Sequence, residues 1–354
     1  MTALRAELHP FRLALKAPLV TGGVSIRFRA GFLVALSADG VTGWGEASPL
    51  PGWSRTSLLD TETSLRDASD ALARGGDAAL DTLLAAMHDT PHARAGVAGA
   101  WADLQARRAG QRLAERLVVC RRSRDPHDGC VRLLGPVDGP DDQIPDGPLV
   151  ADPTGAPASE VAVNALVAAP APSAVEQAAR DAVEAGFRQV KLKVGAADPE
   201  TDVSRIRAAR AGLGPAAGLR LDANGAWDER TALEVLERVQ SCDVAYCEEP
   251  VAGVEAIAAL GRRSPIAVAV DESMRSHADA VQALDLGVRT LIVKPQALGG
   301  PDVALAIAAR AHEAGARVTV TSFLDSAVGV AHALHVAAAV DTVVPPRRAH
   351  GERR

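Results

Sequence analysis

Five short apolar runs in the middle of the chain each end in a charged side chain, and this recurrence limits the fold more than any other feature. The charged residues are Lys193, Asp222, Glu248, Asp271 and Lys294. They lie 29, 26, 23 and 23 residues apart, each gap being about one strand plus one crossover helix. Charged residues at the carboxyl ends of successive parallel strands meet at the top face of a (β/α) barrel. The spacing therefore predicts an α/β barrel with its chemistry at that face.

The first of these runs carries two lysines on alternate positions. Side chains alternate between the two faces of a strand, so Lys191 and Lys193 project to one side while Val190 and Leu192 project to the other. Two ammonium groups on one face of a buried strand repel each other and lose solvation energy. We interpret the pair as serving chemistry rather than packing.

The remaining pattern predicts a second, smaller domain before the barrel. Residues 4–46 alternate as in an antiparallel meander and are followed by a loop at 46–54, whereas 56–74 and 93–117 have helical periodicity. Barrel strands are expected at 161–167, 190–194, 219–224, 244–250, 266–272, 290–295 and 317–323, with 341–344 as a candidate eighth. Intervening or following helices are expected at 174–185, 228–239, 301–314 and 326–339.

These elements predict four regions. They are an α+β domain at 1–117, an atypical linker or insertion at 118–158, a (β/α) barrel at 159–344 and a short tail at 345–354. The linker is dense in Pro, Gly and Asp and has no sustained period, and disorder is one interpretation of it.

Composition excludes several classes of function. A net charge of −6 without a long basic run argues against a nucleic-acid partner. The N-terminus lacks the apolar core of a signal peptide, and the apolar segment 327–340 is interrupted by two histidines, so we expect no membrane partner and a cytoplasmic location. Four cysteines without a C-x-x-C pattern suggest neither a disulfide framework nor a zinc site. The oligomeric state is not determined by these features.

Asp222, Glu248 and Asp271 are carboxylates expected on three adjacent strand ends, where they would repel one another without a cation. Hard oxygen ligands without His or Cys favour Mg²⁺ or a similar ion such as Mn²⁺. The alternative for any one of them, Asp222 above all, is a turn or a helix cap.

Lys193 and Lys294 are expected to face each other across the barrel mouth with the cation between them. A lysine beside a cation and a second lysine has its ammonium form disfavoured, so we expect a lowered pKa and a role as general base. The natural task of such a lysine is to remove a proton from the carbon next to a carboxylate. We therefore expect the substrate to be a small-molecule carboxylate. The alternative is that both lysines are surface groups or ion-pair partners.

The motifs Lys-x-Lys, Asp-Ala-Asn, Glu-Glu-Pro, Asp-Glu-Ser and Val-Lys-Pro occur here in the order that is typical of the enolase superfamily. Within it, residues 43–52, 220–227 and 321–329 resemble the o-succinylbenzoate synthase family. The resemblance implies a (β/α)7β TIM-like barrel with an N-terminal α+β capping domain. It also implies Mg²⁺-dependent dehydration of 2-succinyl-6-hydroxy-2,4-cyclohexadiene-1-carboxylate to o-succinylbenzoate in menaquinone biosynthesis.

The same resemblance implies roles for individual residues. Asp222, Glu248 and Asp271 would bind the metal, with Glu248 preferred over Glu249 because relatives keep the first glutamate. Lys193 would move the proton, Lys294 would stabilise the enolate from the opposite face, and Lys191 would support Lys193. The candidate substrate contacts are Arg220, Asn224, Ser322 and Ser48.

Two departures from the family and several rival activities stay open. Relatives have a shorter link than 118–158, and they continue past the helix at 326–339 into a last strand and a tail that packs on the cap. N-succinylamino acid racemase, dipeptide epimerase and muconate cycloisomerase share the fold and the lysines. A catalytically inactive, truncated barrel is the alternative outside enzymes.

Overall fold

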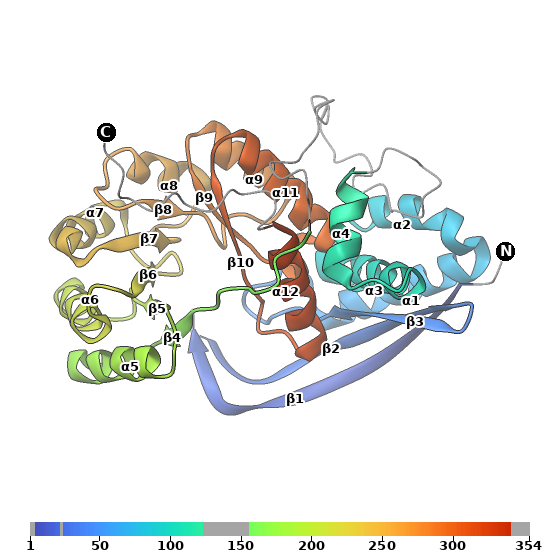
Figure 1. Cartoon of the computed structure of the whole chain (residues 1–354), viewed down its shortest axis with the longest axis horizontal. Helices are drawn as coiled ribbons and strands as arrows, with labels where there is room; N and C mark the ends of the chain where they lie inside the picture. The colour runs from blue at the N-terminus through green and yellow to red at the C-terminus, as the bar shows by residue number, and fades with distance from the viewer. Residues whose placement is uncertain (1–3, 22–23, 123–155, 341–354) are drawn as a thin grey trace. The chain divides into compact units, whose positions relative to one another are not determined.

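The computed structural model describes residues 4–21, 24–122 and 156–340 (Figure 1). The chain divides into two compact units. Unit 1 comprises residues 1–160, 293–313 and 318–354, and unit 2 comprises 161–292 and 314–317. Most of the predicted linker 118–158, the candidate strand 341–344 and the tail 345–354 lie outside the described residues. The predicted domain boundaries stay a prediction.

Unit 1 opens with a three-stranded antiparallel sheet in the order β1-β2-β3. Its elements are β1 (Arg5–Thr21), β2 (Val24–Ala38), β3 (Val41–Ala47), α1 (Leu58–Gly75), the 3₁₀ turn η1 (Gly76–Ala79), α2 (Leu80–Ala86), α3 (Pro91–Arg108), α4 (Leu113–Arg122), α10 (Pro295–Leu298), α11 (Pro301–Glu313) and α12 (Ala327–Val340). The turn between β2 and β3 is Asp39-Gly40, both with positive φ, as the two-residue turns of twisted hairpins require. The predicted meander at 4–46 is confirmed.

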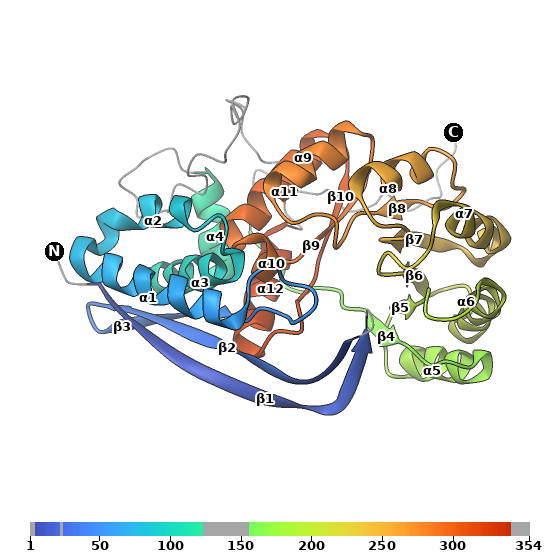
Figure 2. The same cartoon turned by 180° about the vertical axis from the view of Figure 1, so that it is seen from behind.

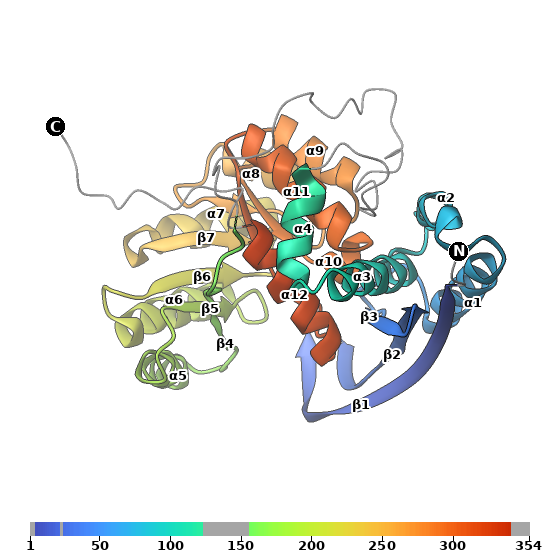
Figure 3. The same ribbon diagram turned by 45° about the vertical axis from the view of Figure 1, so that its right-hand side comes forward.

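Helix α3 packs against the sheet at very short range, mainly against β3 (Figure 3). A Cβ atom added at Gly45 would lie 2.0 Å from the carbonyl oxygen of Gly96, and one added at Gly43 would lie 2.2 Å from the amide nitrogen of Leu104. These two positions of β3 therefore require glycine, because the helix backbone occupies the space of a side chain. The close contact fixes where the end of β3, including Glu46, is held.

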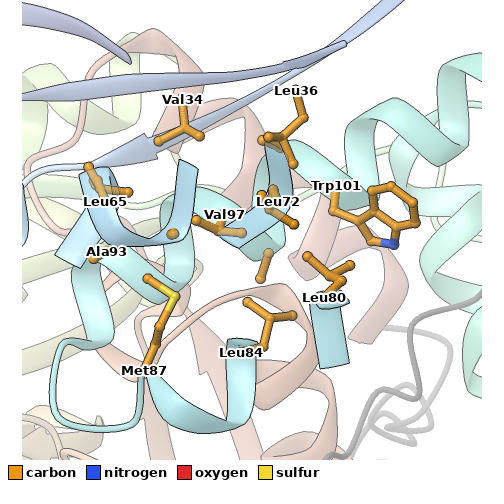
Figure 4. Packing of buried hydrophobic residues seen from close by; sticks show 14 of the residues in the cluster. Val34, Leu36, Leu65, Leu72, Leu80, Leu84, Met87, Ala93, Val97 and Trp101 are labelled. Atoms are coloured by element: carbon orange, nitrogen blue, oxygen red, sulfur yellow. The ribbon is translucent and has the colours of Figure 1, made fainter. Parts of the chain in front are cut away.

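The hydrophobic core of unit 1 lies between this sheet and helices α1, α2 and α3. Figure 4 shows Leu65 and Leu72 of α1 beside Val34 and Leu36 of β2, with Trp101 of α3 at the border of the cluster. Leu36 and Leu72 are almost completely buried. Full burial of each such side chain stabilises the fold by about 1.5–3 kcal/mol.

Unit 2 has parallel strands that alternate with helices. Its elements are β4 (Ala165–Val167), α5 (Pro172–Glu184), β5 (Gln189–Lys193), α6 (Pro199–Leu213), β6 (Gly218–Asp222), α7 (Glu229–Arg238), the 3₁₀ turn η2 (Gln240–Cys242), β7 (Val244–Glu248), α8 (Val254–Gly261), β8 (Val268–Ala269) and α9 (His277–Asp285). The strands follow the order β4-β5-β6-β7-β8, and α5, α6 and α7 lie along one side of them (Figure 2). Strands β9 (Thr290–Val293) and β10 (Arg317–Val320) pair with each other, and their residues are divided between the two units.

Local sequence explains where several helices begin. Ser57 and Asp60 form a reciprocal capping box at the start of α1. Asp198 and Asp228 accept hydrogen bonds from the third backbone amide of α6 and α7, and Pro199 occupies the first turn of α6. Gly186 follows α5 with φ +92°, as predicted for a residue that ends a helix.

Several sequence predictions of elements are wrong in detail. The helix predicted at 93–117 is two helices, because Gly110 adopts φ +65° and ends α3 before α4 begins. The strands predicted at 161–167, 266–272 and 317–323 shorten to Ala165–Val167, Val268–Ala269 and Arg317–Val320. The turn η1 and helix α2, in the segment after Arg74, were not predicted.

Within the described ranges, no helix combines the length and the apolar character that a membrane crossing would need. The most apolar late helix, α12, contacts β3, α4 and α11 instead.

Candidate active site

The strand register of unit 2 places Lys193, Asp222 and Glu248 in one row across the sheet. Lys191 and Arg220 lie in a second row. Lys193 of β5 is level with Asp222 of β6, and Asp222 is level with Glu248 of β7. Glu248 is in turn level with Ala269 of β8, and Asp271 follows two residues later. Residues in register, and residues two apart on one strand, share a face of the sheet. This explains how residues 78 positions apart in sequence, from 193 to 271, form one cluster.

The lysines of β5 point into this cluster. Val190 and Leu192 are fully buried on the other face, whereas the side chains of Lys191 and Lys193 keep 16% and 28% exposure. The Nζ of Lys193 lies 2.7 Å and that of Lys191 lies 2.8 Å from the same oxygen, Oδ2 of Asp222. Lys191 also donates to Oε2 of Glu248 at 3.0 Å. The alternation predicted for Lys191 and Lys193 is confirmed.

Three carboxylates gather beside these ammonium groups. Asp222, Glu248 and Asp271 are buried, and each offers an oxygen within 4.8 Å of the others. Burial raises the pKa of Glu248 to about 7, because its charged form loses water while the lysine at 3.0 Å compensates only in part. Burial also acts to raise the pKa of Asp222, but Lys191 and Lys193 outweigh it, so the pKa of Asp222 is lowered.

The carboxylates act on Lys191 in return. Burial favours its neutral form, yet Asp222 and Glu248 outweigh burial and raise the pKa of Lys191 above its usual value. The lowered lysine pKa that the sequence predicted applies to a site that holds a bound cation. The carboxylates by themselves favour the ammonium form of Lys191.

The donor set fits a hard divalent cation. Three buried carboxylates at this separation repel one another strongly, and oxygen ligands without His, Cys or Met select ions such as Mg²⁺. The two ammonium groups neutralise part of the charge on Asp222 and Glu248. A divalent cation would neutralise more of it.

Glu249 has a different task from Glu248. Its backbone has φ +39°, in the left-handed region and outside the extended conformation of β7, which ends at Glu248. The carboxylate of Glu249 accepts a hydrogen bond from the Asp271 amide at 2.8 Å and another from the Ser273 hydroxyl. Glu249 thus supports the backbone of Asp271 and does not belong to the cluster.

Asn224 and Arg220 also lie at this face. Asn224 Oδ1 accepts from Lys193 Nζ at 2.7 Å, and its amide group donates to Glu272 Oε1 at 3.0 Å. Arg220 is level with Lys191 and Tyr246, and its guanidinium carbon lies 5.1 Å from the Tyr246 ring centre. Nε of Arg220 is buried and makes no hydrogen bond within the described residues.

The other predicted site residues belong to unit 1. Lys294 directly follows β9, and its Nζ lies 5.6 Å from the centre of the Phe323 ring. Ser322 is exposed after β10. Ser48 is completely buried, donates to Glu46 Oε1 at 2.7 Å and accepts from Arg29 Nη2 at 3.0 Å. The roles of these residues toward a substrate stay predictions.

Sequence reasoning missed a polar network in unit 1 around Glu46 and Arg29. Glu46 accepts hydrogen bonds from the amides of Ser326 and Gly329 at 3.0 and 2.8 Å, at the first turn of α12. Arg29 donates to the carbonyl oxygens of Ser48 and Leu324 at 2.6 and 2.7 Å. The partners in α12 and before it lie almost 300 residues away in sequence, so no local pattern points to them.

Comparison with known proteins assigns both parts of the chain. The family described as "Enolase C-terminal domain-like" matches residues 174–354, about half of the chain, and the family described as "MenC, N-terminal domain" matches residues 3–100.

Two curated relatives carry the same name over different lengths. The chain is 37% identical to the o-succinylbenzoate synthase of Thermobifida fusca (strain YX) over 183 residues, 51% of this chain and 56% of that protein. It is 26% identical to the o-succinylbenzoate synthase of Klebsiella pneumoniae (strain 342) over 336 residues, 94% of this chain and 86% of that protein. The match with the first of these relatives thus spans little more than half of that protein's length.

A solved structure shows the fold. The dipeptide epimerase from Enterococcus faecalis V583, complexed with Mg and the dipeptide L-Leu-L-Tyr, has a TM-score of 0.78 and 22% sequence identity, covering 96% of this chain and 88% of that one. The fold class is therefore the predicted one, an α/β TIM-like barrel with an N-terminal capping domain. With its carboxylates and lysines on successive parallel strands and its match to the C-terminal domain family, the chain belongs to the enolase superfamily.

Proposed function

We propose that the chain is a Mg²⁺-dependent o-succinylbenzoate synthase. The observation that carries this proposal is the row of Lys193, Asp222 and Glu248 across the sheet, with Lys191 and Asp271 beside it. The match of residues 3–100 to the MenC N-terminal family supports this member of the superfamily over others. The reaction is the dehydration of 2-succinyl-6-hydroxy-2,4-cyclohexadiene-1-carboxylate, a step of menaquinone biosynthesis, and we place it in the cytoplasm.

Asp222, Glu248 and Asp271 would hold the metal, with Mn²⁺ as the alternative ion. When bound, the metal supplies positive charge beside the substrate carboxylate, where negative charge grows as the neighbouring proton leaves. Glu249 would keep Asp271 in place through the Asp271 amide.

Lys193 would act as the base and then as the acid. Its neutral amine takes the proton from the carbon that bears the carboxylate, and the electron pair of that C–H bond moves toward the carboxylate. The ring then expels the hydroxyl group, to which Lys193 returns the proton, so that water and an aromatic ring are the products. Asp222 and Asn224, both 2.7 Å from Nζ, would orient the amine.

The other residues would assist by charge and by contact. Lys191 would keep the local field positive beside Lys193, and Lys294 would stabilise the enolate as a cation. Arg220, Asn224, Ser322 and Ser48 are the proposed substrate contacts.

The test is turnover of the cyclohexadiene substrate, followed by ultraviolet absorbance, with Mg²⁺ and with a chelator. We expect aromatisation with Mg²⁺, none with the chelator, and a loss of at least about a hundredfold in Asp222→Asn. A cooperatively folded protein that binds Mg²⁺ and leaves the substrate unchanged would disprove the proposal. Deuterium exchange into N-succinylamino acids by that same protein would then assign it to the racemases.

A further inference from the structure

A buried ion pair on helix α6 holds the backbone on both sides of Val194, directly after Lys193. Arg205 donates from Nη2 to the carbonyl oxygen of Lys193 at 2.8 Å. Asp202 accepts at Oδ2 from the amide of Gly195, also at 2.8 Å. The two side chains join each other through Arg205 Nη1 and Asp202 Oδ1 at 2.8 Å.

Both members of the pair are buried to an extent that is unusual for charged groups. Asp202 is 0% and Arg205 is 4% exposed. Removing two charges from water costs several kcal/mol, and the cost is offset only when their hydrogen-bonding groups are satisfied. Here the pair uses both carboxylate oxygens and also donates from Arg205 Nε to the carbonyl oxygen of Ala169 at 3.1 Å, in the loop after β4.

The clamped segment has little freedom left. Gly195 has φ +86°, and a Cβ atom there would lie 2.7 Å from the Cβ of Ala226. The amide of Val194 donates to the carbonyl oxygen of Asp222 at 2.9 Å. The carbonyl of Lys193 and the two amides that follow it are therefore each fixed by a partner.

Fixing this backbone fixes the start of the Lys193 side chain. The Nζ of Lys193 meets Asp222 Oδ2 and Asn224 Oδ1 at 2.7 Å, and a long flexible chain holds two such contacts only if its Cα is well placed. A displacement of about 1 Å at a reacting group can cost about a hundredfold in rate.

We propose that Arg205 and Asp202 are positioning residues that hold Lys193 in place for proton transfer. The inference rests on the proposed function for its kinetic test, because Lys193 must be the base. The side-chain hydrogen bonds of Arg205 and Asp202 described above go to each other and to backbone groups, and none of them goes to the carboxylate cluster. The pair therefore acts on Lys193 by holding the backbone of residues 193–195.

Arg210, on the same helix, offers a matched control. It donates to the carbonyl oxygens of Gly214 and Ala217 at 2.7 Å and to that of Cys242 at 2.8 Å. These carbonyls precede β6 and β7, at the opposite ends of the strands from Lys193 and Asp222. A variant at Arg210 removes similar backbone bonds without touching the segment after Lys193.

The kinetic experiment compares full-length Arg205→Met, Arg205→Lys, Asp202→Asn and Arg210→Met. We expect Arg205→Met to lower kcat about ten- to a hundredfold with KM within about twofold, and to increase the primary deuterium isotope effect on kcat. Arg205→Lys should recover part of kcat, because its ammonium group still reaches one carbonyl. Arg210→Met should keep kcat within about twofold of the unaltered protein, even if it lowers the unfolding temperature as much as Arg205→Met does. Equal kcat and equal isotope effects in the Arg205→Met and Arg210→Met proteins would overturn the proposal.

A second readout does not depend on turnover. The chain has four lysines, Lys16, Lys191, Lys193 and Lys294, and Lys16 is exposed. Trace acetylation by acetic anhydride, read by mass spectrometry, gives the reactivity of Lys193 relative to Lys16. We expect Arg205→Lys and Asp202→Asn to change this ratio at least about threefold and Arg210→Lys to leave it unchanged.

The two readouts separate the two hypotheses. A changed acetylation ratio in a protein that never turns over the cyclohexadiene would uphold the positioning role and reject the proposed function. An unchanged ratio together with unchanged kinetics in an active enzyme would reject the positioning role alone. If Arg205→Met fails to fold, the kinetic and the acetylation measurements are both made with Arg205→Lys and Asp202→Asn.

Discussion

At the scale of single residues, the use of lysine instead of arginine bears on the proposed roles of Lys191, Lys193 and Lys294. The chain has 38 lysines and arginines, of which four are lysines, and three of those four are Lys191, Lys193 and Lys294. Arginine stays protonated under all ordinary conditions, whereas the pKa of lysine responds to burial and neighbouring charge. A chain that uses arginine almost everywhere else thus has lysine at the proposed base, Lys193, and at two further proposed site positions, Lys191 and Lys294.

Replacing Lys193 by arginine tests this distinction. A guanidinium group in place of the ammonium would keep the positive charge beside Asp222 and Asn224 but could not accept a proton. We therefore expect Lys193→Arg to lower kcat about 10²- to 10⁴-fold while Mg²⁺ binding by calorimetry is retained. The exposed Lys16→Arg variant is the control and should keep full activity. Retention of more than about a tenth of the original kcat by Lys193→Arg would show that Lys193 is not the base.

Residue-level prediction succeeded where strand alternation decides the outcome. Lys191, Lys193, Asp222 and Glu248 follow from period two and from their positions at strand ends. It failed where a side chain acts through backbone groups. Asp202 and Arg205 are three residues apart on α6, a spacing that is typical of exposed ion pairs, and nothing local distinguishes this buried pair from them.

At the scale of elements, a side chain of one strand completes the start of a distant helix. The first amides of a helix lack partners within the helix. For α12, Glu46 at the end of β3 supplies some of these partners, because it accepts from the amides of Ser326 and Gly329 and also from the Ser326 hydroxyl. A carboxylate is favoured there because the start of a helix carries partial positive charge.

We expect Glu46→Ala to lower the free energy of unfolding by about 3 kcal/mol, since it leaves several buried donors without an acceptor at about 1–3 kcal/mol each. Urea denaturation followed by circular dichroism measures the loss. Glu62→Ala, which removes one ion pair with Arg66 on the surface of α1, should cost no more than about 0.5 kcal/mol. A similar loss in both variants would mean that Glu46 does not support α12.

The elements themselves were predictable to the extent that their signals are local. Alternation identified the meander, and the regular recurrence of apolar runs identified the parallel strands. The break between α3 and α4 depends on the left-handed conformation of Gly110, and glycine within a helical pattern has no single meaning. The role of Glu46 depends on a partner 280 residues away, which no window of sequence contains.

At the scale of the whole molecule, a buried histidine couples folding to pH. His332 of α12 is almost completely buried, and its ring lies where a Cβ at Gly99 would come within 2.7 Å. Burial lowers the pKa of His332 to about 4, although Asp103 acts in the opposite direction. Because the folded form gives up its proton at lower pH than the unfolded chain, acidification from about pH 6.5 toward 4 protonates the unfolded chain first.

Stability from His332 is therefore fully present above about pH 6.5 and is lost as pH falls through this window. In His332→Gln this loss is absent. As pH falls through the window, we therefore expect the free energy of unfolding of the variant to rise relative to that of the unaltered protein by about 1.4 kcal/mol per pH unit, about 3 kcal/mol in total. Urea denaturation at several pH values measures the difference, and the constant offset above about pH 7.5 gives the packing cost of the substitution. If the free energies of unfolding of the two proteins differed by a constant amount from about pH 7.5 to about pH 4, His332 would not be the group that couples folding to pH.

Unit 1 is built from stretches of chain that are made at very different times during synthesis. Residues 161–292, which form most of unit 2, leave the ribosome as one continuous piece. The strands β1 to β3 precede them, yet Arg29 and Glu46 find some of their partners at Leu324, Ser326 and Gly329, which are made after unit 2. During translation the barrel strands can thus assemble before α12 is available to pair with residues of β2 and β3. A nascent chain stalled before residue 324 would have an incomplete first unit and a largely complete second unit.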